Sequence, residues 1–115
     1  MTFDEYQKKA ITTELMERPA HVSANDPAFV AKILGLVGEA GEVAEKFKKI
    51  VRDKEGVIEE ADIELVKKEL GDVLWYVSAV SDYIGLNLDD VAESNLAKLF
   101  DRRARGKARG SGDNR

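Results

Sequence analysis

Apolar residues recur every three or four positions in four stretches of this chain, and this spacing is typical of amphipathic helices. The clearest stretch follows Asp62, which is placed to cap a helix, and ends before Gly85, which is placed to stop it. Its apolar positions share one face of the predicted helix: Ile63, Val66, Leu70, Val73, Val77, Val80 and Ile84. The pattern predicts a long helix that packs against others along this face.

Three further helices follow from similar patterns. The first is predicted to begin at Thr2, with Glu5 completing a capping box, and to end at Arg18-Pro19. The second is predicted over 27–51, after the cap Asp26, and the last over 88–103, after Asn87. The second helix has an apolar stripe of its own: Phe29, Ile33, Val37, Ala40, Ala44, Phe47 and Val51. We therefore predict an all-α fold, a four-helix antiparallel bundle formed by one domain over residues 1–103.

The amino-acid composition excludes several kinds of functional site and bears on where the protein is expected to reside. The chain has no cysteine, which excludes disulfides, zinc-thiolate sites and thiol nucleophiles. The amino terminus is acidic and lacks the apolar run of a signal peptide, and no stretch is long and apolar enough to span a membrane. We expect a soluble, cytoplasmic protein without a membrane partner.

Charge is distributed unevenly along the chain. Residues 1–97 contain 11 basic and 20 acidic side chains, whereas residues 98–115 contain 7 basic and 2 acidic ones. The end, 104–115, reads as a basic, glycine-rich tail outside the helical domain. It could serve as a nucleic-acid arm, as a backbone nest for phosphate, or as a solvated segment. The solvated segment is our first expectation, and nucleic acid is not an expected partner.

Two acidic pairs indicate metal chemistry. Glu39 and Glu42 lie in the second helix and Glu69 and Asp72 in the third, each pair with i,i+3 spacing that places both carboxylates on one helical face. If the helices pack antiparallel, four carboxylates converge, and hard oxygen ligands of this kind select Mg²⁺, Mn²⁺ or Ca²⁺. The alternative is that both pairs are ordinary solvated faces. A di-iron centre would require Glu-x-x-His motifs, and the single histidine, His21, is expected on the surface.

These motifs resemble a known family. The sequences 38–42, Gly-Glu-Ala-Gly-Glu, and 69–76, Glu-Leu-Gly-Asp-Val-Leu-Trp-Tyr, are similar to the paired Glu-x-x-Glu and Glu-x-x-Asp motifs of MazG-like all-α nucleoside triphosphate pyrophosphohydrolases. The resemblance extends over about residues 5–103. It implies hydrolysis of (deoxy)nucleoside triphosphates between the α and β phosphates to monophosphate and pyrophosphate, with nucleotide-pool sanitation as the expected purpose. It also implies association into a homodimer or homotetramer.

The resemblance assigns roles to individual residues. Mg²⁺, with Mn²⁺ as a substitute, would be held by four ligands: Glu39, Glu42, Glu69 and Asp72. Substrate contacts would come from Tyr76, Asn95, Lys98 and Arg102. Many relatives have a further glutamate where this chain has Gly38, so the general base is left unassigned, with Glu39 and Glu42 as candidates.

Several secondary expectations complete the prediction. Some dCTP-preferring relatives place an aromatic residue where this chain has Lys49, which argues against that preference, while Gln7 and Thr13 are expected to line the base pocket. Lys46 is expected to pair with Glu42. Trp75 is expected at an oligomer contact. The alternatives are a phosphoribosyl-ATP pyrophosphohydrolase-like enzyme and a non-enzymatic helical interaction module with a nucleic-acid-binding tail.

Overall fold

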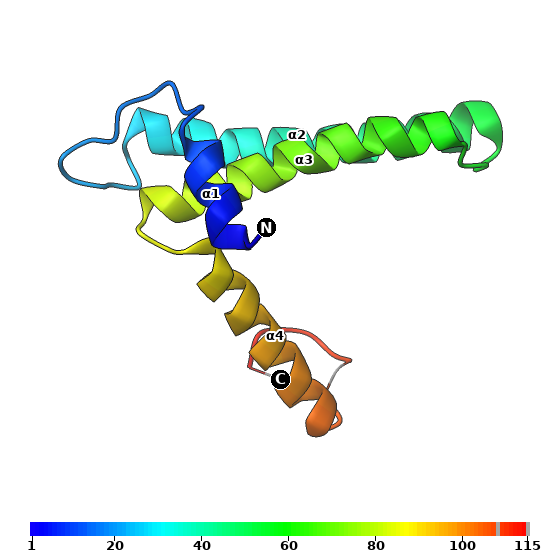
Figure 1. The fold of residues 1–115 in the computed structure, drawn as a ribbon. Coiled ribbons are helices and arrows are strands. Elements are labelled where there is room, and N and C mark those ends of the chain that lie inside the picture. The colour runs from blue at the N-terminus through cyan, green and yellow to red at the C-terminus, as the bar shows by residue number, and fades with distance from the viewer. Residues whose placement is uncertain (108, 115) are drawn as a thin grey trace.

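The structure, a computed structural model, describes residues 1–107 and 109–114, and all regular elements within them are helices. In chain order they are α1 (Phe3–Ile11), α2 (Pro27–Lys54), α3 (Glu60–Tyr83) and α4 (Leu88–Ala104). Helices α2 and α3 lie side by side as a long hairpin, α1 packs across α3, and α4 projects away from the hairpin (Figure 1). The predicted all-α class with four helices is confirmed.

The turn between α2 and α3 differs from the prediction by a few residues. Helix α2 continues to Lys54 and ends at Glu55, whose φ of 52° is left-handed, followed by Gly56 at 81°. Helix α3 begins one turn earlier than predicted, because Glu59 and not Asp62 is its N-cap. Asp62 lies three positions inside the cap, where its carboxylate accepts from the Glu59 N–H at 2.9 Å in a capping box.

Helix α1 is shorter than predicted. Its capping box of Thr2 and Glu5 is present, but the helix ends at Ile11 instead of Arg18. The Thr12 and Thr13 hydroxyls donate to the Lys9 and Ala10 carbonyls at 2.6 and 2.7 Å. Such local side-chain bonds compete with continued helix, which explains why the apolar pattern beyond Ile11 misled the prediction.

The start of α4 is tied to α1 by side chains from that helix. Asn87 is the N-cap, as predicted, but its side chain makes no capping hydrogen bond. Instead, Gln7 Oε1 accepts from the Leu88 N–H at 3.1 Å, and Asp4 Oδ1 accepts from the Asp89 N–H at 2.9 Å. These two bonds satisfy amide groups that a helix start leaves without partners.

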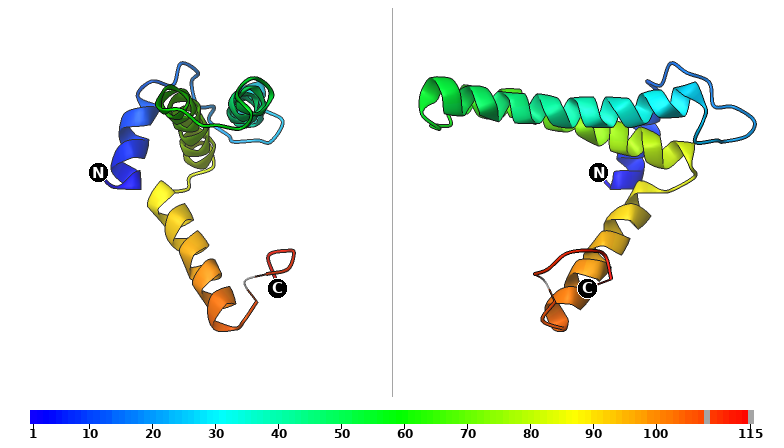
Figure 2. Two further views of the ribbon diagram at one scale, coloured as in Figure 1. Left: turned by 90° about the vertical axis from the view of Figure 1, so that its right-hand side faces the viewer. Right: turned by 180° about the vertical axis from the view of Figure 1, so that it is seen from behind.

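The apolar core of a single chain is small. Its buried hydrophobic residues gather where α1, α3 and the start of α4 meet, with one more near the end of α2: Ala10, Ile50, Ala79, Tyr83 and Leu88. Many residues of the predicted apolar faces of α2 and α3 are instead exposed, including Val37 at 66%, Val51 at 68% and Ile63 at 56%. The views in Figure 2 show the reason, since α4 leaves the hairpin and does not cover it. The four helices therefore do not close into a bundle within one copy of the described chain.

Two findings bear on the predicted tail and on membranes. Residues 109–114 lie beside α4, while Ala108 and Arg115 of the predicted tail lie outside the described residues. Among the described helices, none combines the length and apolar character that crossing a membrane requires.

Candidate functional site

Three carboxylates from α2 and α3 converge. Glu39 on α2 and Glu69 and Asp72 on α3 each place one oxygen within 4.8 Å of the other two. Glu39 and Glu69 are partly buried, whereas Asp72 is exposed. The antiparallel hairpin produces this arrangement because the i,i+3 pair on α3 faces the middle of α2. Such an oxygen-only set suits a hard divalent cation.

Mutual repulsion is visible in the electrostatics of the cluster. The pKa of Glu39 is raised above its ordinary value, first by loss of hydration and then by the negative charges of Asp72, Glu69 and Glu42. A nearby cation would reverse this shift, because it favours the ionised form. Glu42 lies outside the 4.8 Å group and is exposed, but its charge still acts on Glu39.

Lys46 corrects one sequence prediction. Its ammonium lies 3.4 Å from Glu69 Oε1 on the facing helix, and the expected pair with Glu42 on its own helix is not the one formed. The helix α3 thus provides a partner that spacing along α2 alone could not indicate. Lys46 contributes positive charge to one edge of the carboxylate cluster.

Tyr6 is a candidate that sequence reasoning left without a role. The pKa of its phenol is raised by burial and, second, by the charge of Asp72. Tyr6 therefore lies within electrostatic reach of the cluster and keeps its proton at neutral pH, so its hydroxyl can donate a hydrogen bond. The only signal in the sequence was its place beside Gln7 in the part of α1 that resembles the family.

An aromatic pocket lies next to the carboxylates. A cavity of about 240 Å³ is lined by side chains from the segment after α1, from α2 and from α3: Thr13, Glu14, Leu15, Met16, Ala28, Ala31, Lys32, Trp75 and Tyr76. Tyr76 lies one turn after Asp72, and its ring packs on the backbone of Gly35, where an added Cβ would be 2.2 Å from the ring. Because Gly35 is one turn before Glu39, Tyr76 connects the cavity with the cluster.

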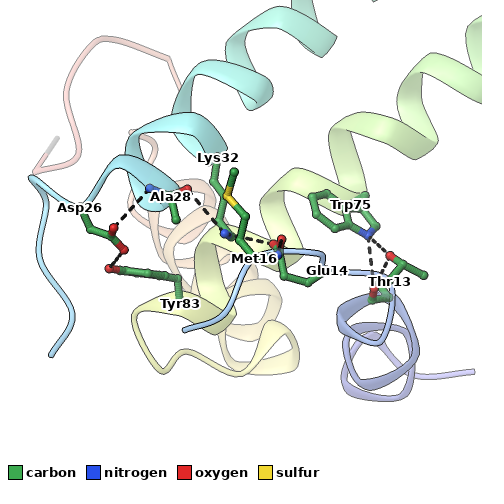
Figure 3. A network of polar contacts seen from close by, with 9 residues as sticks. Thr13, Glu14, Met16, Asp26, Ala28, Lys32, Trp75 and Tyr83 are labelled. Carbon is green, nitrogen blue, oxygen red and sulfur yellow. Dashed lines mark hydrogen bonds and ion pairs between the residues drawn. The ribbon is translucent and has the colours of Figure 1, made fainter. Parts of the chain in front are cut away.

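Trp75 and Thr13 form one wall of this cavity. The indole Nε1–H donates to Thr13 Oγ1 at 2.8 Å and to the Ala10 carbonyl at 3.2 Å (Figure 3). Thr13 thus lines this cavity, and its expected place in the base pocket stays a prediction. Trp75 thereby fixes the end of α1 against α3 within the same chain, and its expected oligomer contact stays a prediction.

Gln7, the other residue expected at the base pocket, does not line this cavity. It is buried, and its Nε2 donates to the carbonyls of Ser78 and Leu86 at 3.3 and 3.0 Å. With the Leu88 bond described above, its side chain joins α1, α3 and the start of α4. A buried amide that satisfies three backbone groups is a structural clamp.

The predicted phosphate contacts lie elsewhere on the molecule. Asn95, Lys98 and Arg102 are on α4, which points away from α2 and α3 (Figures 1 and 2). Lys98 Nζ and Arg102 Nη2 contact Asp113 Oδ1 at 3.0 and 3.2 Å, and Arg102 Nη2 also donates to the Gly112 carbonyl at 3.1 Å. Arg102 is buried, and its Nε has no hydrogen-bond partner among the described residues. One chain therefore holds the cations and the carboxylates apart.

The glycines near the acidic pairs are open. An added Cβ at Gly38, Gly41 or Gly71 would meet nothing within 4 Å among the described residues. The facing helix therefore does not approach these glycines closely. Gly35 is the position where a close approach occurs.

Comparison with known proteins identifies the family. Residues 29–106 match the model of the MazG nucleotide pyrophosphohydrolase domain, which covers more than half of the chain. The chain belongs to this family. Its sequence is also 51% identical over 82 residues to the Gene 37 protein of Mycobacterium phage L5, covering 71% of this chain and 72% of the phage protein. No solved structure matches the chain significantly.

Membership in this family agrees with the presence of the carboxylate cluster. It supports a nucleotide pyrophosphohydrolase, an enzyme class that generally depends on a divalent metal, and the carboxylate cluster lies within the matched region. The name of the phage relative does not indicate an activity.

Proposed function

We propose that this protein hydrolyses (deoxy)nucleoside triphosphates between the α and β phosphates, using Mg²⁺ held by the carboxylate cluster. The convergence of Glu39, Glu69 and Asp72 within 4.8 Å, in a chain of the MazG family, supports the proposal most strongly. A bound cation would relieve the repulsion among the three carboxylates, and oxygen ligands favour Mg²⁺, with Mn²⁺ as a substitute.

Each residue near the cluster has a proposed part. Glu39, Glu69 and Asp72 would hold the metal, and Glu42 would complete the set by a change of rotamer. The ion supplies charge neutralisation for the triphosphate and activation of water. Tyr76 would contact the sugar or base. Glu39 and Glu42 remain the candidates for the general base.

The phosphate contacts imply a second copy of the chain. Asn95, Lys98 and Arg102 lie on a helix that points away from the cluster of their own chain, so they would reach the triphosphate of a neighbouring protomer. Exposed apolar residues on the hairpin, such as Leu34 at 66%, favour such an association. We propose a homodimer or homotetramer of the helical domain over residues 1–103, with residues 104–115 as an appended tail.

The decisive experiment measures pyrophosphate release from a panel of ribo- and deoxyribonucleoside triphosphates, with and without Mg²⁺. We expect release that requires metal and falls at least 100-fold in Glu39→Gln and Asp72→Asn. Glu64→Gln, an exposed change on α3, is the matched control and should keep full activity. Absence of metal-dependent release from every nucleotide would contradict the proposal.

The same assay separates the alternatives. A phosphoribosyl-ATP pyrophosphohydrolase would act on that substrate and on none of the simple triphosphates. A nucleic-acid-binding module would show salt-sensitive DNA binding that disappears with the tail, and no effect of Glu39→Gln. Removal of non-standard nucleotides, the expected purpose, would appear as faster release from damaged than from normal triphosphates.

A further inference from the structure

Two polar side chains in the wall of the aromatic pocket are already bound to the protein. The Trp75 indole N–H is shared between Thr13 Oγ1 and the Ala10 carbonyl at 2.8 and 3.2 Å, and the Thr13 hydroxyl donates to the same carbonyl at 2.7 Å (Figure 3). An indole has one N–H, and a hydroxyl has one donor. Neither side chain therefore has a hydrogen left to donate to a ligand in this cavity.

The charged pair in the same wall is also engaged. Glu14 accepts from the backbone N–H groups of the two residues that follow it, and its Oε2, which lies 3.0 Å from Lys32 Nζ, has no surface open to a ligand. The Lys32 side chain is only 9% exposed. Its ammonium contacts Glu14 and the Ala28 carbonyl and lies 5.8 Å from the centre of the Tyr83 ring. The pair therefore closes the wall without offering the cavity a free charge.

The surface that remains for a ligand is mainly apolar. Leu15 and Met16 line the cavity from the segment after α1, Ala28 and Ala31 line it from α2, and Trp75 adds an aromatic ring. The volume, about 240 Å³, is below the range of about 300 to 1,000 Å³ for drug-sized ligands. Aromatic side chains stack on nucleobases whatever their hydrogen-bonding pattern. The cavity therefore suits a nucleobase that is held by stacking and apolar contact.

The carboxylate cluster determines how a nucleotide would enter this cavity. Tyr76 lies one turn after Asp72 and packs against Gly35, so it marks the end next to the cluster. Ala28 lies eleven residues before Glu39 on α2, about 16 Å along the axis at 1.5 Å per residue, and marks the far end. With its phosphates at the cluster, a nucleotide would direct its sugar toward Tyr76 and the Watson–Crick edge of its base toward Ala28.

We propose that this pocket selects nucleotides whose base is alkylated on the Watson–Crick edge, such as N6-methyladenine and O6-methylguanine. The proposal rests on the proposed function and names its substrate class. The edge of an ordinary base carries donors and acceptors that would leave water at the far end of the cavity without gaining a side-chain partner, which is unfavourable. A methyl group on this edge removes one donor and adds apolar surface against Leu15, Met16 and Ala28.

The test measures binding without turnover. Trp75 is the only tryptophan of the chain, so its fluorescence reports on this pocket, and calorimetry gives the affinities. AMP, GMP, N6-methyl-AMP and O6-methyl-GMP are titrated in EDTA, with ribose 5-phosphate as the control for binding through phosphate alone. We expect each methylated nucleotide to bind at least about fourfold more tightly than its parent, the factor for one buried CH₂ group at about 0.8 kcal/mol.

A second comparison tests whether the Watson–Crick edge is the part of the base that enters. The nucleotides dTMP and dUMP differ by a methyl group that lies off this edge, so they should bind alike. AMP and GMP should also differ by less than fourfold, because apolar contact distinguishes bases less than hydrogen bonds to their edges do.

Variants test whether the selection arises in this pocket. Ala28→Leu places a larger side chain at the far end of the cavity, so it should remove the advantage of the methylated nucleotides. Ala61→Leu, at an exposed position in the first turn of α3, is the matched control and should keep the advantage. Circular dichroism checks the fold of both. Should Ala28→Leu not fold, Met16→Gln, at a position 51% exposed, replaces it and should reduce the advantage at least twofold.

Parent nucleotides that bind as tightly as their methylated forms, or a lack of binding by every nucleotide, would overturn the assignment. An equal gain for dTMP over dUMP, or an advantage that persists in Ala28→Leu, would overturn it as well. Metal-dependent pyrophosphate release from ordinary triphosphates without any methylation advantage in binding would overturn this inference and leave the proposed function intact. Tighter binding of the methylated nucleotides without any pyrophosphate release would do the reverse.

Discussion

At Gly35, unlike Gly38 and Gly41, a side chain of the facing helix lies against the glycine backbone. An alanine Cβ at this position would lie 2.2 Å from Tyr76 Cε1, a distance that real contacts do not show. Gly35→Ala must therefore displace the ring or separate α2 from α3. We expect a loss of about 1–3 kcal/mol in the free energy of unfolding, as for other overpacked sites, together with a higher KM for nucleotide. Chemical denaturation and steady-state kinetics would measure both effects.

The neighbouring glycines supply the control. An alanine at Gly38 or Gly41 meets open space among the described residues, and alanine is the better helix former by about 1 kcal/mol. Gly38→Ala and Gly41→Ala should therefore stabilise the protein, opposite in sign to Gly35→Ala. If all three substitutions shift stability in one direction, the close approach at Gly35 is not what distinguishes it.

The role of a residue was predictable where its partner lies a few positions away on the same helix. The i,i+3 acidic pairs predicted a cluster, and three of the four carboxylates do converge. The pairing of Lys46 was misjudged because its partner, Glu69, lies on another helix. The bond between Gln7 and Leu88 was not predicted because the two residues are distant in sequence. The ion pair between Glu14 and Lys32 was not predicted for the same reason, because the two residues are 18 positions apart and no periodic pattern connects them.

At the scale of elements, the turn between α2 and α3 depends on Asp62. The Glu59 N–H and the Lys54 ammonium, which is 2.9 Å away, lower the pKa of Asp62 below its ordinary 3.8. A depressed carboxyl pKa adds stability that is present above the unfolded value and is lost as pH falls through the folded value. Asp62→Asn should therefore lower the unfolding temperature by a few degrees at pH 7 and flatten its fall below about pH 4.

Thermal melts across the acid range would test this expectation. Asp53→Asn is a suitable control, because Asp53 pairs with Arg52 at 2.7 Å but both side chains are more than half exposed. Exposed pairs contribute little to stability, so this variant should melt as the parent does. An Asp62→Asn protein with an unchanged acid transition would show that the cap is dispensable.

On helix α4, the tail residue Asp113 contacts two cations that are also the proposed phosphate ligands, so the tail and the substrate would compete for them. Asp113 occupies Lys98 and Arg102 as a phosphate oxygen would, and hydrogen bonds from both cations lower the pKa of Asp113, so it is ionised at neutral pH. If these cations bind substrate phosphates, Asp113→Asn should lower KM severalfold and leave kcat unchanged. Initial-rate kinetics would separate the two constants.

Asp101→Asn is the matched control for Asp113→Asn, since Asp101 pairs at 2.8 Å with Arg105, the C-cap residue of α4. It should not change KM. An unchanged KM in Asp113→Asn would mean that the tail and the substrate do not share these cations. The basic end of α4 was predictable from the sequence. Its contact with the tail was not, because a glycine-rich segment has no periodicity that predicts where it folds.

For the whole molecule, hydrophobic periodicity predicted four helices but not how they pack. It correctly marked apolar faces on α2 and α3, yet Val37, Val51 and Ile63 on those faces are exposed in a single chain. A periodic apolar stripe indicates that a helix face becomes buried. It does not indicate whether the residues that bury this face belong to the same chain. The early end of α1 and the direction of α4 leave these faces uncovered within one chain.

This reasoning leads to a prediction about assembly. Val37 is 66% exposed on α2 and belongs to the predicted apolar stripe of that helix, so Val37→Glu would place a charge in the proposed contact between copies. We expect the parent protein to be a dimer or tetramer with a melting temperature that rises with protein concentration, because association stabilises only the folded form. Val37→Glu should shift the sedimentation profile to monomer and lower the melting temperature. Lys67→Glu, at an exposed position on α3, is the control and should leave both unchanged. A parent protein that sediments as a monomer and melts at one temperature at every concentration would contradict the prediction, and it would also remove the second copy that brings Lys98 and Arg102 to the carboxylates.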